Sequence, residues 1–213
     1  MGRDCADCLV EKAGLTKHPE GRKAEIVDTA LALAFEAGPN RVTTVAIAER
    51  LGLTQPAIYR HYRSKADLWA AITDRLGAEV AGNIARVEAM ESPALDRLRA
   101  LVLGHLALVR HTPALPEIML ARDPNSADAV VRVAMQARMA AFQHTLLRLC
   151  EAGQAEGALT TDIDPRDLAA LIMGVLQSLI LRLLLTRNPG LLVEDGERLL
   201  ALQIAAFERQ SED

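Results

Sequence analysis

The sequence predicts an all-α protein: an N-terminal three-helix helix-turn-helix domain followed by a helical body, with about nine helices in total. Half of the 213 residues are hydrophobic, Ala and Leu dominate, and aromatic residues make up only 3%. Ala and Leu favour helices, whereas aromatic residues favour strands, so this composition indicates helices throughout. The second observation is the segment 43–65, TTVAIAERLGLTQPAIYRHYRSK, whose pattern is typical of two short helices joined by a tight turn.

The first helix is expected over Lys23–Ala37. Its apolar residues Ile26, Ala30 and Ala34 recur at a spacing of four and fall on one stripe, which is the pattern of an amphipathic helix. The run Gly38-Pro39-Asn40 ends it. This helix is expected to pack across the following pair and to complete a three-helix domain.

The pair itself is defined by its caps and its glycine. Thr43 or Thr44 can cap the first helix, and Gly52 follows its last apolar residue, where a left-handed backbone is often required. Thr54 can cap the second helix, 55–61, and Pro56 lies in its first turn, where the missing N–H costs little. Such a layout is that of a helix-turn-helix, whose second helix enters the DNA major groove.

The segment from about Arg22 to Ile72 resembles the DNA-binding domain of TetR-type (TetR/AcrR) transcriptional repressors. The resemblance covers about a quarter of the chain. The matching pieces, in order, are Ala34-Phe35-Glu36-Ala37-Gly38, Val42-Thr43-Thr44, Ile47-Ala48, Leu51-Gly52-Leu53, Tyr59-Arg60-His61-Tyr62, and Ser64-Lys65 with Leu68.

Eight residues are expected to contact DNA. The N-terminal end of a recognition helix approaches the base edges, so Gln55 can pair with adenine, and Ala57 or the Pro56 ring can meet a thymine methyl. The full set is Thr44, Gln55, Pro56, Ala57, Tyr59, Arg60, His61 and Lys65.

The resemblance implies the roles of the remaining positions. Tyr59, His61 and Lys65 match positions that contact backbone phosphate, and Arg60 is either a guanine reader or a phosphate clamp. Thr44 lies at a helix N-terminus, where a hydroxyl and free N–H groups suit a phosphate.

The charge is unevenly distributed along the chain. The net charge is −4, but residues 22–65 hold seven Lys or Arg against four Asp or Glu. A locally basic domain can bind phosphates even on an acidic body, because salt screens distant charges.

Residues 1–20 are expected to form a flexible arm, 21–66 the DNA-binding domain and 67–213 a domain for effector binding and dimerisation. Cys5 and Cys8 in the arm form a CxxC, which is either incidental or a thiol or metal sensor; no second CxxC supplies the other zinc ligands. An odd number of cysteines and the lack of a visible export signal favour a reducing cytoplasm.

The sequence after the first domain predicts successive helices separated by Pro and Gly. Ser64, with Asp67 at the third helical position, can begin the helix that links the two domains; Gly157 ends a long helix, and Asp164 with Pro165 begins the next. The expected helices are 65–90, 93–110, a short one ending at 121, about 127–155, 165 to 186 or 187, and about 193–209.

The helix that begins at Pro165 is apolar nearly all round and so needs cover on every side. Its most apolar run, 168–181, is expected to be too short to cross a membrane, for which about 18 residues are needed. A homodimeric four-helix bundle of this helix and the last one would supply the cover. The expected dimer contacts are Leu176, Leu179, Ile180, Leu183, Leu200, Ile204 and Phe207.

The expected function is a ligand-responsive repressor that binds a palindromic operator as a homodimer and is released by a small, mainly apolar effector. Met and Phe suit adaptable apolar pockets. Candidate effector-binding residues are His105, Met119, Met135, Met139, Phe142, His144, Met173 and Gln177. The alternatives are a DNA-binding regulator without an effector, an activator or a chromosome-organising factor, and the thiol sensor. No catalytic motif is visible, and no cofactor, metal or membrane association is expected.

Overall fold

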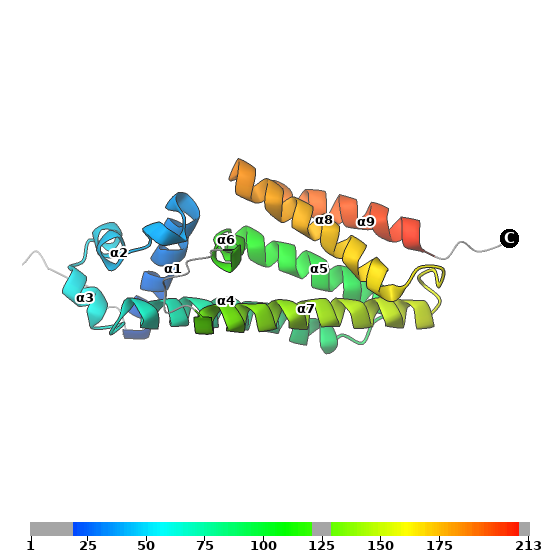
Figure 1. Ribbon diagram of the computed structural model, residues 1–213, viewed down its shortest axis with the longest axis horizontal. Helices are drawn as coiled ribbons and strands as arrows, with labels where there is room; N and C mark the ends of the chain where they lie inside the picture. The colour runs from blue at the N-terminus through cyan, green and yellow to red at the C-terminus, as the bar shows by residue number, and fades with distance from the viewer. Residues whose placement is uncertain (1–18, 121–128, 209–213) are drawn as a thin grey trace, which may run out of the picture.

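The computed structural model describes residues 19–120 and 129–208. Within these ranges the chain forms nine α-helices and one 3-10 turn, and its only β-type pairing is the single bridge Leu159–Glu208. Figure 1 shows a small N-terminal domain, the head, at one end of an elongated helical body. The all-α prediction is confirmed.

The head consists of α1 (Pro19–Ala37), the 3-10 turn η1 (Pro39–Arg41), α2 (Thr44–Leu51) and α3 (Gln55–Tyr59). Its core is formed by Ile26 and Ala30 from α1, Ile47 from α2 and Ile58 from α3, all fully buried. The first helix therefore crosses the other two, as the stripe of apolar residues predicted.

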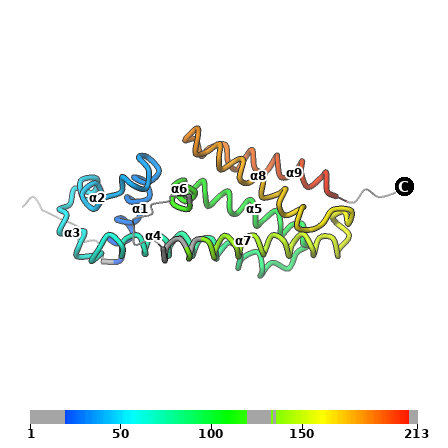
Figure 2. Tube along the Cα trace, viewed as in Figure 1, coloured from blue at the N-terminus to red at the C-terminus, as the bar shows by residue number. Residues whose placement is uncertain are grey.

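Helix α4 (Lys65–Glu88) leaves the head and runs into the body as one continuous rod (Figure 2). Ser64 caps it, since its hydroxyl accepts a hydrogen bond from the Asp67 N–H over 3.0 Å. Trp69, Ile72 and Leu76 of this helix are buried. The head and the body thus share one helix.

The body adds five helices, α5 (Ala94–His111), α6 (Leu115–Leu120), α7 (Ala129–Ala155), α8 (Pro165–Thr186) and α9 (Leu191–Phe207). Of these, α5 and α7 pack against α4, while α8 packs on α7, and α9 packs on α5 and α8. Asp164 caps α8, accepting from the Arg166 N–H over 2.8 Å, and Gly157 has the left-handed φ of 73° that stops the chain from continuing α7. Both ends lie where the sequence pattern predicts them.

Two expectations about boundaries need correction. Helix α1 begins at Pro19, so the last two residues of the expected arm are helical. Helix α3 ends at Tyr59, which leaves Arg60 and His61 in the turn that follows it. Cys5 and Cys8 lie outside the described residues.

The membrane expectation also needs correction. By length and composition alone α8 could cross a membrane, since it has 22 residues and a mean hydropathy of 2.2 in its most apolar window. The apolar run was expected to end before the charged Arg182, but the helix tolerates that residue and continues to Thr186. In the structure 39% of that window is buried inside the chain, and a single helix of this kind is weak evidence for a membrane span.

Candidate functional site

The turn between α2 and α3 has the geometry that a helix-turn-helix requires. Gly52 has φ 64° and ψ 32°, a left-handed conformation that costs a glycine little, and the Leu53 N–H donates to the Ala48 carbonyl over 2.8 Å. Thr43 caps α2 by accepting from the Ala46 N–H. Thr54 occupies the first position before α3 but makes no capping bond with its side chain.

Helix α3 presents a polar surface to solvent. Gln55 and Pro56 at its start and Tyr59 and Arg60 at its end are exposed, and Tyr59 is 43% accessible. Figure 1 places α3 at the outer end of the head, away from the body. This surface can therefore approach a groove of duplex DNA without obstruction from residues 19–120 and 129–208, the part of the chain that the structure describes.

Two of the predicted DNA-contact residues lie deeper than expected. Ala57 is only 9% accessible and faces the head core, so Pro56 is the better-placed neighbour for a thymine methyl. Thr44 is 7% accessible, and its hydroxyl accepts a hydrogen bond from the Gln55 amide over 3.0 Å. The structure thus brings Thr44 and Gln55 together, a pairing that their separation in sequence did not indicate.

The basic residues near α3 are available to phosphates. Arg60, Arg63 and Lys65 are exposed, and none of them forms an ion pair with another residue in the described ranges. By contrast, Arg50 on α2 is paired with Glu36 of α1, and this hydrogen bond lowers the pKa of the Glu36 carboxyl. The charge available for DNA is therefore concentrated after α3.

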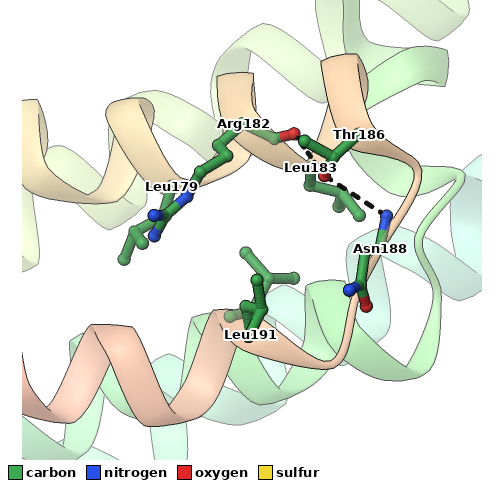
Figure 3. A pocket seen from close by; sticks show the side chains of 7 residues that line it. Leu179, Arg182, Leu183, Thr186, Asn188 and Leu191 are labelled. Atoms are coloured by element: carbon green, nitrogen blue, oxygen red, sulfur yellow. Dashed lines mark hydrogen bonds between the residues drawn. The ribbon is translucent and has the colours of Figure 1, made fainter.

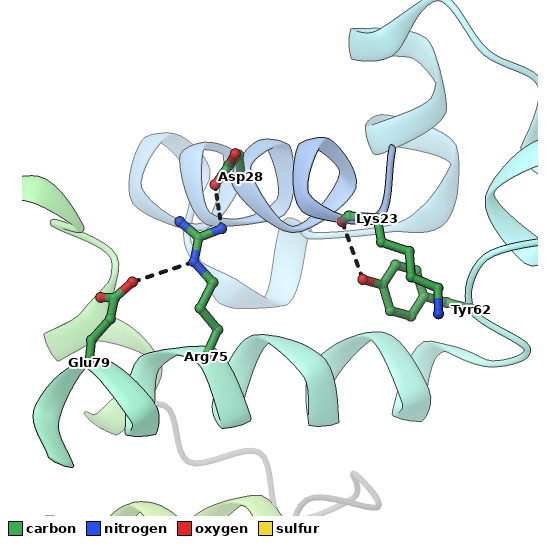
Figure 4. Close-up of polar contacts among 5 residues, drawn as sticks. All are labelled: Lys23, Asp28, Tyr62, Arg75 and Glu79. Carbon is green, nitrogen blue, oxygen red and sulfur yellow. Dashed lines mark hydrogen bonds and ion pairs between the residues drawn. The ribbon is translucent and has the colours of Figure 1, made fainter. Parts of the chain in front are cut away.

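Two polar contacts hold α1 at the junction with α4, one from the segment before α4 and one from α4 itself (Figure 4). The Tyr62 hydroxyl donates to the Lys23 carbonyl over 3.2 Å, and the Arg75 guanidinium lies between Asp28 of α1 and Glu79 of its own helix. Beside Arg75 a cleft of about 360 Å³ separates α1 from the residues that join α5 to α6. The junction between head and body is thus held by specific contacts around an unfilled space.

The predicted effector residues do not all gather at one place. His105 of α5 and Phe142 of α7 are fully buried with ring centroids 4.8 Å apart, and Met173 is buried on α8. His144 and Gln177 are exposed, so they cannot line an internal pocket in this conformation. Met119 and Met139 are partly buried, and the side chain of Met135 lies outside the described part of the chain.

His105 of the body is buried, and its ring has no hydrogen-bond partner among the described residues. Within the described part of the chain neither of its ring nitrogens has a hydrogen-bond partner, although the side chain is only 1% accessible. Burial lowers the pKa of its imidazole to about 4, so the ring is neutral at pH 7. An unpartnered buried polar group is rare and normally has a ligand or water nearby.

Most of the predicted dimer contacts on α8 and α9 face the core of the single chain. Six of the seven side chains are already buried within the chain and cannot meet a second copy; only Ile180 is partly accessible. The prediction was based on apolar character alone, which does not separate the core-facing side of an all-apolar helix from its outer side. The six buried residues are Leu176, Leu179, Leu183, Leu200, Ile204 and Phe207.

The exposed side of α8 is a different stripe, which sequence reasoning missed. Its residues recur at spacings of three and four, the pattern of a helix–helix seam, and two of them are small enough for close approach of a partner helix. They are Leu171, Gly174, Ser178, Leu181 and Leu185, and Leu202 of α9 is also exposed. The buried residues of α8 recur at the same spacings, so the sequence pattern alone does not distinguish the two stripes.

A DNA-binding helix-turn-helix protein is the class that this head and its exposed α3 define. Residues 26–72 match the model of bacterial regulatory proteins of the tetR family, and residues 94–194 match that of the tetracyclin repressor-like C-terminal domain. The chain belongs to the TetR family of DNA-binding transcriptional regulators.

Solved structures share this fold over most of their length. The ketosteroid transcriptional regulator KstR2 of Mycobacterium tuberculosis superposes with a TM-score of 0.75 at 18% identity, covering 89% of this chain and 96% of its own. SmeT, the repressor of a multidrug efflux pump of Stenotrophomonas maltophilia, gives 0.65 at 22% identity, covering 89% and 91%.

Curated relatives match a shorter part. The nucleoid occlusion factor SlmA of Vibrio vulnificus is 32% identical over 100 residues, which are 46% of this chain and 50% of that protein. The SlmA of Marinomonas is 29% identical over 101 residues, covering 47% and 51%. The chain thus spans about half the length of these relatives.

Proposed function

We propose that the protein is a homodimeric repressor of the cytoplasm that binds a two-fold symmetric operator and is released by a small, mainly apolar effector. One observation carries the proposal: a polar, exposed α3 and an uncovered apolar stripe on α8 occur in the same chain. Helix α3 would contact one half-site of the operator. The stripe on α8 would be buried if two copies of the chain associated.

The exposed stripe supports a second copy of this chain as the partner. Leu181, Leu185 and Leu202 are 57%, 76% and 63% accessible, and contiguous apolar surface of this kind usually marks an interface. Two copies of α8 and α9 would form a four-helix bundle about a two-fold axis. Burying about 1,500 Å² of apolar surface at roughly 25 cal/mol/Å² provides a gross drive of tens of kcal/mol before the costs of association.

The pair His105 and Phe142 supports an effector site in the body. A ligand with an apolar frame and one hydrogen-bonding group would pack on Phe142 and satisfy a ring nitrogen of the neutral His105. The ligand releases DNA if it binds more tightly to a conformation in which the spacing of the two heads does not fit the operator. A preference of about 1–3 kcal/mol for that conformation lowers DNA affinity about 5- to 150-fold.

Thermal unfolding with apolar probes tests the effector. Triclosan, a long-chain fatty acid and a ketosteroid form a suitable panel, because solved relatives of this fold carry those names. A probe that raises Tm and releases DNA from the wild type, but does neither in His105→Leu, would support the site. If no apolar probe does either, the effector part of the proposal fails.

A second candidate function is a chromosome-organising DNA-binding factor that needs no effector. The match to nucleoid occlusion factors over about half of the chain favours it. Mapping of binding sites across the genome separates the two: an effector-responsive repressor occupies few sites next to promoters, whereas a chromosome-organising factor occupies many dispersed sites.

A thiol or metal sensor lacks comparable support. Among the described residues no group of three or more His, Cys, Asp or Glu could hold a metal ion. Cys150 is buried on α7, and burial raises the pKa of its thiol to about 12, which leaves it unreactive at neutral pH. Replacement of Cys5 and Cys8 by Ser should leave DNA binding and its response to oxidant unchanged.

A further inference from the structure

One arginine connects three elements that lie far apart in the sequence. Arg187 directly follows α8, and its backbone N–H donates to the Leu183 carbonyl over 2.8 Å to close that helix. Its φ of 56° lies in the left-handed region, and no other non-glycine residue of the described ranges has a positive φ. Residues with a Cβ seldom adopt this conformation, so the surrounding contacts must maintain it.

The guanidinium of Arg187 contacts the head directly. Nη1 donates to the Phe35 carbonyl over 2.8 Å, and Cζ lies 5.4 Å from the centroid of the Phe35 ring. Phe35 belongs to the last turn of α1, where carbonyls have no partner within the helix. The arginine therefore satisfies a free carbonyl and stacks on the same residue's ring.

The same nitrogen also holds α6. Nη1 forms an ion pair with Oε1 of Glu117, whose side chain is only 10% accessible. A carboxylate this buried needs a cationic partner, which ordinary surface pairs do not. Arg187 thus joins the end of α8, the end of α1 and the middle of α6 through one side chain.

Helix packing and polar contacts together hold the head on the body, and a cleft remains beside them. Helix α1 packs against α4 and α6. The cleft of about 360 Å³ is lined by Leu31, Ala32 and Phe35 on the head side and by His111 and Pro113 on the body side. The side-chain contacts across the junction are the Asp28–Arg75 pair and those of Arg187. Of these two, only Arg187 adjoins the helix that carries the exposed stripe.

We propose that Arg187 is a positioning residue that fixes the head relative to α8 and thereby sets the separation of the two α3 helices in the dimer. This inference rests on the proposed dimeric function. If two α8 helices pack across a two-fold axis, the dimer interface determines the position of each head, because Arg187 holds the head at the end of α8. Without the arginine each head can turn about α4, and the spacing of the two recognition helices is no longer unique.

The chain offers a matched control on the same helix. Arg182 lies little more than one turn before Arg187 and is similarly exposed, 45% against 48%, but it pairs with Asp195 of α9. Figure 3 shows Arg182 on α8 near the turn that leads to Leu191 of α9. Arg187→Gly removes the side chain and fits the left-handed backbone without strain, so it separates the effect of the missing guanidinium from a failure to fold. Arg182→Ala removes an arginine that does not touch the head.

The experiment measures affinity for a duplex selected with the wild-type protein and for its isolated half-site, at one salt concentration. Arg187→Gly should reduce the preference for the full site about tenfold or more, with half-site affinity and dimer mass unchanged and with a lower Tm because Glu117 loses its partner, while Arg182→Ala keeps the preference. An unchanged preference in Arg187→Gly, or a loss of the dimer, would overturn the inference. A wild type with no preference for the full site would overturn the proposed function as well.

Distances between the heads give a second measurement that needs no DNA. A spin label at Asn40→Cys, exposed in η1, reports the head separation in a chain with Cys5 and Cys8 replaced by Ser and the buried Cys150 retained. The wild type should give one narrow distance distribution and Arg187→Gly a broad one. Equal widths in the two proteins would contradict a positioning role.

Discussion

The side chain of Gln55 donates a hydrogen bond to the hydroxyl of Thr44 over 3.0 Å, so the first residues of α3 and α2 are joined. Thr44 is buried and cannot move to a new partner easily, whereas Gln55 is exposed. The bond holds the Gln55 side chain, which we propose reads a base, in one orientation before DNA binds. Such preorganisation lowers the entropy cost of binding.

Gln55→Ala should relax base preference at one position of each half-site and weaken binding to the preferred sequence by about 1–3 kcal/mol for each base interaction removed. Selection from random DNA with the variant measures this directly. Thr44→Val is the companion variant: it keeps the buried shape but frees Gln55, so it should shift the same position less. The same consensus from all three proteins would rule out base reading by Gln55.

Tyr59→Ala and Lys65→Ala should weaken binding to all sequences alike. Removing the charged Lys65 side chain should reduce the slope of log affinity against log salt by about 0.9, because fewer counterions are released. Tyr59 is neutral, so Tyr59→Ala should weaken binding with the slope unchanged. Titration of each variant at several salt concentrations provides the affinities and the slopes. Arg166→Ala is the control, because Arg166 is exposed and belongs to the start of α8, the end of that helix farther from the head (Figure 1). A Lys65→Ala slope equal to that of the control, or an undiminished affinity of Tyr59→Ala, would argue against phosphate binding by that residue.

Leu181→Glu together with Leu185→Glu should convert the dimer to a monomer that keeps its helical content. Both side chains are more than half exposed in the single chain, so charge there costs the folded monomer little, but it cannot be buried against a second copy. Sedimentation equilibrium measures the mass. Val133→Glu, equally exposed on α7 at 61%, is the control and should stay dimeric. A dimer that survives the double change would place the interface elsewhere.

His105 should make stability depend on pH. The imidazole of the unfolded chain takes up a proton near pH 6.5, whereas burial lowers its pKa in the folded chain to about 4. The stabilising contribution is therefore complete above pH 6.5 and is lost as the pH falls toward 4, by about 3 kcal/mol in all. Urea unfolding at pH 7, 5.5 and 4.5 measures this decline.

His105→Leu should remove that part of the acid destabilisation, because the variant has no proton to take up at this position. His144→Gln, which replaces an exposed histidine of α7, should keep the wild-type dependence. A variant at position 105 that loses stability with acid as steeply as the wild type would show that another group is responsible.

The elements of this fold were predictable because each carries a local signal. Gly52, Ser64 and Asp164 mark helix ends by chemistry that acts within a few residues, and the structure places each of them where the pattern predicted. The exposed residues of α3 likewise follow from their positions in a short helix with one buried side. Ala57 was misjudged because a five-residue helix has few positions from which to infer its faces.

The contacts between distant segments were not predictable in this way. Leu176 and Leu185 look alike in an all-apolar helix, and only the packing of α7 and α9 decides that the first is buried and the second exposed. The meeting of Arg187 with Phe35 joins residues 152 positions apart. No local pattern encodes a pairing of that kind, so both the dimer stripe and the junction of head and body required coordinates.

Selection of binding sites from a random DNA library by the purified protein tests the central claim most directly. Two α3 helices related by a two-fold axis should recover an inverted repeat whose half-site centres lie about 10 base pairs, or a multiple of that, apart. Recovery of a single asymmetric site, or of no consensus at all, would contradict the account.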